Sequence, residues 1–177
     1  TLILLRLANL LITSYLCTLY QKFVRLLPPK MYIQHYNIVT PLGFDLPTTA
    51  RLLLRERSAI ARYPMYGQLT DVCLSKIGDG AIESRFQQVV ERNDFSRLEK
   101  LLLLAIAPIF HKIKITPRTA LILSSTKGNI SALANGDSVP LLSTLAQKMA
   151  NAIGVTTTPI VVSNACVSGA MALSVAD

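Results

Sequence analysis

The residue with the clearest chemical potential in this chain is a cysteine at the end of an apolar run. In "TPIVVSNACVSGAMALSVAD", residues 158–177, Cys166 follows Ile160, Val161 and Val162 and precedes a series of small residues. The apolar run predicts a strand covered on both faces and the small residues predict a helix, so Cys166 is expected where that helix begins. First-turn N–H groups have no intrahelical partner, and together with the helix dipole they favour a thiolate.

The same N–H groups can hold an oxyanion on an attacked carbonyl. Gly169, Ala170 and Ala172 are expected to let the helix pack closely against neighbouring backbone. This arrangement is similar to the strained strand–nucleophile–helix turn of hydrolases, with sulfur in place of a hydroxyl. The alternative is a buried, inert cysteine, because a free cysteine often behaves as a small hydrophobe. The spacing by itself leaves both interpretations open.

The remaining cysteines and histidines do not form a recognisable ligand set. Cys17, Cys73 and Cys166 are odd in number and lack CxxC spacing, and His35 and His111 are far apart in the sequence. Neither a zinc site nor a disulfide framework is therefore expected. A reducing, cytoplasmic setting fits the residues after Met31 best.

Composition and charge describe a globular chain with a mildly basic balance. The 177 residues are 51% hydrophobic and 16% charged, which excludes a disordered or low-complexity chain. Half of the net charge of +8 lies in residues 1–30. The basic balance suits an acidic protein partner. The sequence has no stripe of Lys and Arg interleaved with aromatic residues, so it does not predict nucleic-acid binding. "RLLLRERSAIAR", residues 51–62, is either a solvated helix face or a docking patch formed by Arg51, Arg55, Arg57 and Arg62.

Residues 1–30 form a separate apolar extension, and Pro28-Pro29 marks its boundary. Between Arg6 and Lys22 lie fifteen uncharged residues, short of the roughly 20 that a membrane span needs. The extension is either upstream sequence that is not translated, with Met31 as the start, or a membrane-associated amphipathic helix, or a signal-like segment. Because the chain begins with Thr1 and ends at Asp177 inside a predicted helix, it is expected to be a fragment of a longer product.

The order of predicted elements indicates an α/β fold. The helix at 45–59 has Asp45 as a cap, Pro47 in its first turn and Leu52, Leu53 and Leu54 as its apolar side. Pro108 should kink or end the helix at 94–112, and Gly154 should cap the one at 138–154. Residues 60–93 show turn signals at Gly67 and 78–80 and no assigned element. A strand that Pro41 and Gly43 break into a turn is predicted at 32–43, further strands at 118–129 and 158–166, and a last helix at 167–176. Strands alternating with helices predict a layered fold with a mixed, largely parallel sheet and covering helices.

Several of these motifs are similar to one known family. "VSNACVSGAMALSVA" resembles the nucleophile motif of the β-ketoacyl-acyl carrier protein synthases of the thiolase-like superfamily, small–small–Ala-Cys-small-Ser/Ala-Gly. Further landmarks follow the order of that family: "IVTPLG" (38–43), "RLLLRERSAI" (51–60), "DFSRLEKLLLLAI" (94–106) and "ALILSSTKGN" (120–129). The resemblance spans residues 32–177, so that 31–177 would be the N-terminal half of a truncated synthase domain.

The resemblance implies a decarboxylative Claisen condensation with malonyl-acyl carrier protein, in fatty acid or polyketide/polyene biosynthesis. Cys166 would accept the acyl chain as a thioester, and its own N–H would be one half of the oxyanion hole. The family's two histidines and second oxyanion donor would lie beyond Asp177, since neither His35 nor His111 matches them. The fragment alone is therefore expected to be inactive.

The resemblance also implies partners and cofactors. The substrates would arrive on the phosphopantetheine of an acyl carrier protein, and no metal or redox cofactor is implied. The enzyme would be a homodimer, or a heterodimer with a related subunit. Lys127 departs from the family's Gly-rich turn and is expected at the surface, where it would contact a carrier phosphate at most weakly. The alternatives are a thiolase or an initiating synthase, and a non-catalytic fragment or membrane-associated interaction protein.

Overall fold

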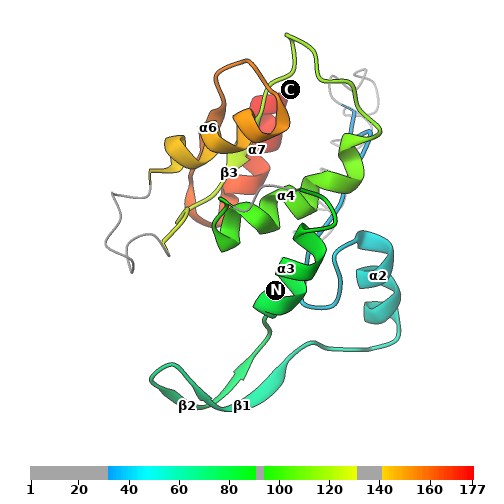
Figure 1. Ribbon diagram of the computed structural model, residues 1–177, viewed down its shortest axis with the longest axis vertical. Helices are drawn as coiled ribbons and strands as arrows, with labels where there is room; N and C mark the ends of the chain where they lie inside the picture. The colour runs from blue at the N-terminus through cyan, green and yellow to red at the C-terminus, as the bar shows by residue number, and fades with distance from the viewer. Residues whose placement is uncertain (1–31, 91–93, 131–140) are drawn as a thin grey trace, which may run out of the picture. The chain divides into compact units, whose positions relative to one another are not determined.

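The computed structural model describes residues 32–90, 94–130 and 141–177 (Figure 1). The chain divides into two compact units, Thr1–Ile33 with Asp177 and Gln34–Ala176. The predictions for residues 1–30 and for 138–140 lie outside the described residues. Within the described ranges, no helix combines the length and the apolar character that crossing a membrane requires.

The second unit is mixed α/β, as the sequence predicts. The part of the chain that the structure describes has five α-helices and two two-stranded sheets. In chain order these are α2 (Leu46–Leu54), β1 (Ala61–Tyr66), β2 (Leu69–Leu74), α3 (Asp79–Phe86), α4 (Arg97–Phe110), β3 (Ile122–Ser124), α6 (Leu142–Ile153), β4 (Ile160–Val162) and α7 (Ser168–Ala176), with a 3₁₀ turn at Ala165–Val167 before α7. The pair β3–β4 is parallel and the pair β1–β2 antiparallel, so a largely parallel sheet is not found among these residues.

The parallel pair is short and has a helix on each face. Leu123 of β3 lies opposite Val161 of β4, and both pack toward the side chains of α6. Successive side chains of a strand point to opposite faces, so the buried Val162 points to the other side. Helix α7 contacts both strands, and β3 passes between α6 and α7 in the view of Figure 1.

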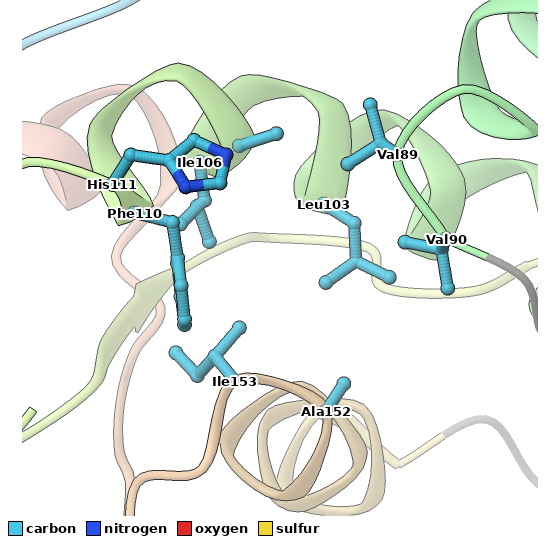
Figure 2. Close-up of a pocket in the computed structure, with 9 residues that line it drawn as sticks. Val89, Val90, Leu103, Ile106, Phe110, His111, Ala152 and Ile153 are labelled. Atoms are coloured by element: carbon cyan, nitrogen blue, oxygen red, sulfur yellow. The ribbon is translucent and has the colours of Figure 1, made fainter.

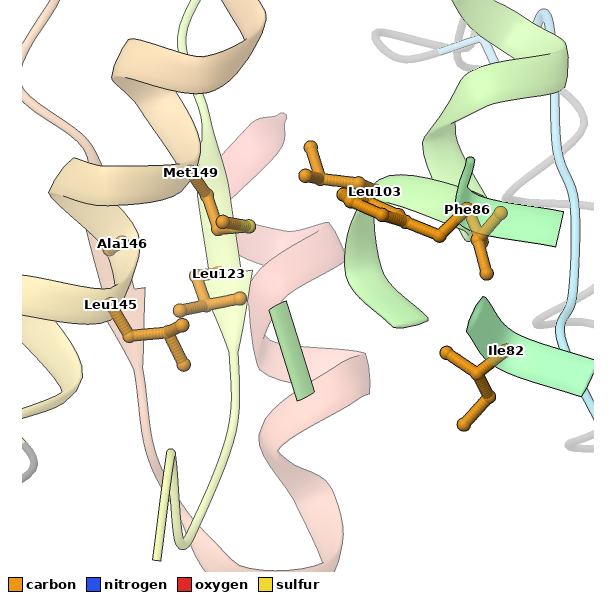
Figure 3. Close-up of a cluster of buried hydrophobic side chains, with 8 residues drawn as sticks. Ile82, Phe86, Leu103, Leu123, Leu145, Ala146 and Met149 are labelled. Carbon is orange, nitrogen blue, oxygen red and sulfur yellow. The ribbon is translucent and has the colours of Figure 1, made fainter. Parts of the chain in front are cut away.

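The core lies between helices α3, α4 and α6 and strand β3. Phe86 and Met149 are its largest fully buried side chains, and Phe86 packs edge-on against Phe95 with ring centroids 5.7 Å apart. Apolar side chains from four elements thus hold this part of the chain together. Figure 3 shows the cluster, which consists of Ile82, Phe86, Leu103, Leu104, Leu123, Leu145, Ala146 and Met149.

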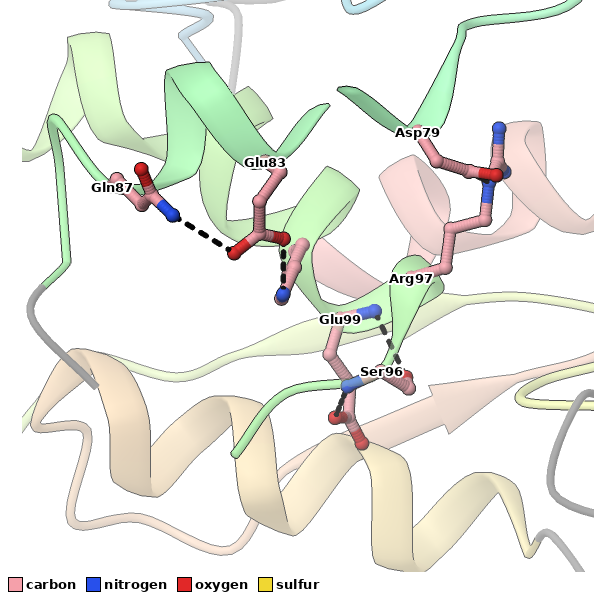
Figure 4. Close-up of polar contacts among 7 residues, drawn as sticks. Asp79, Glu83, Gln87, Ser96, Arg97 and Glu99 are labelled. Atoms are coloured by element: carbon pink, nitrogen blue, oxygen red, sulfur yellow. Dashed lines mark hydrogen bonds and ion pairs between the residues drawn. The ribbon is translucent and has the colours of Figure 1, made fainter. Parts of the chain in front are cut away.

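Local signals fix the ends of the core helices. At the start of α4 the Ser96 hydroxyl accepts from the Glu99 N–H, and the Glu99 carboxylate accepts from the Ser96 N–H at 2.7 Å (Figure 4). This reciprocal capping box satisfies two donors of the first turn. Gly154 caps α6 with a φ of 74°, as predicted. Pro108 lies inside α4, which continues for two residues and ends at Phe110.

A charged contact joins α4 to α6. Glu99 is buried, and its carboxylate accepts a 2.8 Å hydrogen bond from Lys148 Nζ. Lys148 also donates to the Asp94 carbonyl and lies over the ring of Phe95, 5.1 Å from its centroid. The Glu99 carboxylate is therefore desolvated but paired, which is the condition under which a buried charge is tolerated.

At 32–43 the predicted strand is wrong, whereas the predicted turn at Pro41 and Gly43 is confirmed. These residues form no ladder, and only a single bridge joins Thr40 to Gly43. A strand needs a neighbouring strand for its backbone hydrogen bonds, and no described strand lies beside residues 32–43. The Asn37 amide instead donates to the carbonyls of Phe44 and Ala105 and accepts from the Leu46 N–H, which ties the segment to the neighbouring helices.

The predicted helix at 45–59 is shorter than expected. Asp45 caps α2, and its carboxylate accepts from the Thr48 N–H at 2.7 Å. The helix ends at Leu54, and Glu56 follows with a φ of 56°. Of the expected apolar side, Leu53 and Leu54 are exposed, so that part of the prediction is wrong.

The region without assigned elements contains a hairpin and a helix. Gly67, with a φ of 60°, turns β1 back into β2, so the turn signal there is confirmed. At 78–80, where the sequence also predicts a turn, a helix begins instead, and Gly78 is the N-cap of α3. Neither hairpin strand makes more than a marginal contact with another described element.

Candidate functional site

Cys166 sits in the turn that leads from β4 into α7, where the sequence predicts it. The 3₁₀ turn Ala165–Val167 carries it directly to Ser168, the first residue of α7. Because β3 and β4 are parallel, the residues after Ser124 leave the sheet at the same edge. The structure therefore brings two chain segments to the carboxyl edge of the pair, the Cys166 turn and residues 125–129.

The backbone of the Cys166 turn is strained. Ala165 has a φ of 43°, in the left-handed region that residues with a Cβ rarely adopt. Such a conformation costs on the order of 1–2 kcal/mol and persists only where the surroundings hold it. The positive φ falls on the residue before the cysteine and not on Cys166 itself.

Ser168 closes the turn. Its side chain is buried, its Oγ accepts from the Asn164 N–H at 2.7 Å, and the same hydroxyl donates to the Ala165 carbonyl at 2.8 Å. The hydroxyl thereby holds the residues on both sides of Cys166 in one geometry. Sequence reasoning missed this residue, although a serine in the first turn of a predicted helix is a known partner for local backbone groups.

The thiol of Cys166 is accessible. Its residue is exposed, so the burial assumed by the alternative interpretation is not found, and its reactivity stays a prediction. The Val167 N–H donates to the Asn164 carbonyl at 3.1 Å, whereas for the Cys166 N–H no acceptor is found among the described residues. An exposed sulfur beside an available N–H is the arrangement that attack on a carbonyl with stabilisation of its oxyanion requires.

The surroundings of the turn are more open than predicted. Ile160 is 42% exposed, so β4 is not covered on both faces along its whole length. A Cβ at Gly169 would meet nothing within 4 Å, so the expected close backbone packing is absent there. The turn and α7 leave apolar side chains exposed: Val167, Met171 and Val175 follow one another at a spacing of four residues and share one side, whereas Leu173 lies on another side.

The neighbouring turn after β3 contributes polar groups to the same edge. The Gly128 N–H donates to Ser125 Oγ at 3.2 Å, and Gly128 adopts a φ of 65°. Lys127 is exposed, as predicted. The side-chain oxygen of Asn129 is buried and has no hydrogen-bond partner in the part of the chain that the structure describes.

The other predicted candidates lie elsewhere. His111 is the exposed C-cap residue of α4, as expected for a helix-end histidine, and His35 is half-buried in the extended segment. Cys73 is an exposed thiol on β2, and Cys17 lies outside the described residues. No group of three or more metal-ligating side chains occurs within 32–90, 94–130 and 141–177.

Three of the four arginines of the predicted docking patch are exposed, and the fourth forms an ion pair. Arg51, Arg55 and Arg57 are exposed on α2 and just after it. Arg62 instead forms a bidentate ion pair with Asp71 across the hairpin. This hydrogen-bonded pair raises the pKa of Arg62 and lowers the pKa of Asp71.

Comparison of the chain with protein-family models, curated proteins and solved structures found no match.

Proposed function

We propose that this chain carries the nucleophile of an acyltransferase of the elongating β-ketoacyl-acyl carrier protein synthase type, with residues 31–177 as the N-terminal half of a thiolase-like fold. One observation carries the proposal: an exposed cysteine in a strained turn between a parallel strand and a helix. The order of the resembling motifs along residues 32–177 supports the same assignment.

The proposed first step is acyl transfer to Cys166. The thiolate attacks the carbonyl carbon of an acyl thioester, and the Cys166 N–H donates to the oxyanion that forms. Collapse breaks the bond to the phosphopantetheine sulfur, which leaves and takes up a proton. The acyl chain is then held on Cys166 as a new thioester.

The second step is decarboxylative condensation. Malonyl-acyl carrier protein loses CO₂, and the electron pair of the broken bond forms the enolate that attacks the Cys166 thioester. A carbon–carbon bond forms, the bond to Cys166 breaks, and the product leaves on the carrier protein. By the resemblance, two histidines and a second oxyanion donor outside this chain assist the step.

The apolar surface of α7 supports the proposal in a second way. An acyl chain and the covering second half both need apolar contacts beside the nucleophile, and Val167, Met171 and Val175 are exposed on one side of this region. A dry site strengthens the hydrogen bond to the oxyanion. In the proposed enzyme this surface is covered.

The proposed partner is an acidic acyl carrier protein, and Arg51, Arg55 and Arg57 provide exposed positive charge for it. We further propose a homodimer, or a heterodimer with a related subunit. The free thiols of Cys73 and Cys166 suit a reducing cytoplasm.

The test is acyl loading of the product of the complete gene. The protein is incubated with acyl-acyl carrier protein, and thioester formation is measured by the mass of the Cys166 peptide. Cys166→Ala should abolish loading while the circular dichroism spectrum stays unchanged, and Cys73→Ala, which removes the other described exposed thiol, should load normally. Undiminished loading of Cys166→Ala would overturn the proposal.

A further inference from the structure

A basic segment connects α4 to β3. Residues 101–136 contain no acidic side chain, whereas Lys112, Lys114, Arg118 and Lys127 bring four positive charges. The first three of these residues are exposed, and their side chains have no hydrogen-bond or ion-pair partner among the described residues. The positive charge of the loop 112–118 is therefore not neutralised by the part of the fold that the structure describes.

The backbone of this loop is held in place. The Thr119 N–H donates to the Thr116 carbonyl at 2.9 Å, and the Thr119 carbonyl accepts from the Thr157 hydroxyl at 2.7 Å. The resulting turn presents Arg118 to solvent from an ordered backbone. His111, just before the loop, lies at the edge of a separate groove between α4 and α6 (Figure 2).

An exposed aromatic side chain lies beside the start of the loop. The Asn37 amide donates to the Ala105 carbonyl at 3.1 Å, which holds residues 34–37 against α4. This segment, blue in Figure 1, runs beside the end of α4. Tyr36 is 68% exposed and lines one groove together with Lys112. The loop thus begins where a tyrosine and a lysine are exposed next to each other.

This combination fits an anionic membrane surface better than an acidic protein. Each Lys or Arg close to an anionic bilayer strengthens binding about fivefold, and tyrosine side chains favour the membrane–water interface. The sequence that leads into this segment has the same character, because residues 1–30 carry four positive charges, no acid and a long apolar run.

Two groups near Lys112 oppose an anion, and the cations outweigh them. The C-terminal end of α4 carries about half a negative charge, an effect that falls off within the last turn. Asp45 lines the same groove as Lys112, but its carboxylate already accepts from the Thr48 N–H as the cap of α2. Lys114 and Arg118 follow beyond the last turn of α4, so the loop keeps a positive balance.

We propose that Tyr36 and the loop 112–118 form a surface that docks onto an anionic membrane. Lys112, Lys114 and Arg118 bind lipid headgroups, and the Tyr36 ring lies at the level of the headgroups. The surface contains no residue of the Cys166 turn, so the vesicle test below and the loading test of Cys166 can fail independently.

The test makes use of a chain that contains no tryptophan. Tyr36→Trp in the 177-residue chain introduces one fluorescent reporter, and Tyr66→Trp, at a 47% exposed position in the hairpin, is the matched control. Vesicles of phosphatidylcholine and phosphatidylserine should shift the emission of Tyr36→Trp to shorter wavelength, and vesicles of phosphatidylcholine alone should not. Tyr66→Trp should shift with neither. A shift in both variants would overturn the proposal, and so would a shift in neither, which would favour an acidic protein as the partner.

Removal of charge identifies the residues that bind. The triple variant Lys112→Gln/Lys114→Gln/Arg118→Gln should weaken binding to the anionic vesicles at least about tenfold, because three attractions of about fivefold each are lost. Binding is measured by co-sedimentation of the protein with the vesicles. The control Arg51→Gln/Arg55→Gln/Arg57→Gln removes the same charge from exposed positions on and after α2 and should leave vesicle binding unchanged. Equal losses in the two triple variants, or no loss in the first, would contradict the assignment.

Discussion

Helices α6 and α7 both contact the two-stranded sheet, yet α6 buries several side chains and α7 only one. Helix α6 places Leu145, Ala146, Met149 and Ala150 in the interior. Helix α7 buries Ser168 alone and leaves its apolar side chains exposed. One face of the sheet thus packs into the core, while on the other face the helix that follows the Cys166 turn leaves apolar side chains exposed.

The difference shows which helix contributes to the stability of the fold and which helix lies next to an accessible cysteine. Apolar burial on the α6 side contributes most of the stability, because each large side chain buried there gains about 1.5–3 kcal/mol. On the α7 side the geometry of the Cys166 turn depends on a few hydrogen bonds, above all those of Ser168. The two faces should therefore respond differently to the same kind of substitution.

The matched pair Met149→Ala and Met171→Ala should give the largest contrast. Met149 is 1% exposed and Met171 41% exposed. Met149→Ala should lower the free energy of unfolding by about 2–5 kcal/mol, because it leaves a cavity in the core. Met171→Ala should change it by less than about 1 kcal/mol. Urea unfolding followed by circular dichroism measures both, and equal losses would remove the distinction between the two faces.

Ser168→Ala should have the next largest effect, and on both stability and reactivity. It removes the two hydrogen bonds of the Ser168 hydroxyl, to the Asn164 N–H and the Ala165 carbonyl, at a cost of about 0.5–1.5 kcal/mol each. The turn should then relax, and alkylation of Cys166 should slow while that of Cys73 stays unchanged. Ser174→Ala, on the exposed part of α7, is the control. A loss of stability without any change at Cys166 would show that Ser168 does not position the turn.

Asp45 extends the comparison to α2, a helix that also buries little. Hydrogen bonds from the Thr48 backbone and side chain lower the pKa of Asp45 below its ordinary value of 3.8. The ionised cap therefore stabilises the folded chain fully above pH 3.8, and this contribution is lost as the pH falls through the lowered folded pKa. Asp45→Ala should cost about 1 kcal/mol at pH 7.

Asp45→Asn is the matched variant, since asparagine also caps helices well. It should retain most of the stability at pH 7 and lack the acid-dependent part. Thermal unfolding between pH 2 and pH 7 measures the difference. A loss in Asp45→Asn as large as that in Asp45→Ala would show that the charge, rather than the cap, is what matters.

Features encoded by neighbouring residues were predictable from the sequence. Asp45, Gly154 and the turn at Gly67 act through backbone groups within a few residues of themselves, and each lies where it was predicted. The position of Cys166 between a strand and a helix was predictable for the same reason, because the change from an apolar run to small residues is local.

Features that depend on distant residues were not predictable. Residues 32–43 have the composition of a strand but no described partner strand, and Asn37 binds Ala105 across the fold instead. The hairpin was missed because Pro64 lies inside β1 and because most side chains of both strands are exposed, so no apolar face marks them in the sequence. The exposure of Cys166 and the role of Ser168 both follow from how the turn is folded, which spacing alone does not specify.

The central claim is that the turn between β4 and α7 activates Cys166, and an exposed thiol in the same molecule provides the direct control. The 177-residue chain is treated with iodoacetamide at pH 7, and the rates of alkylation at Cys166 and Cys73 are followed by mass spectrometry of their peptides. Activation predicts that Cys166 reacts at least about tenfold faster than Cys73. An equal or slower rate at Cys166 would contradict the account.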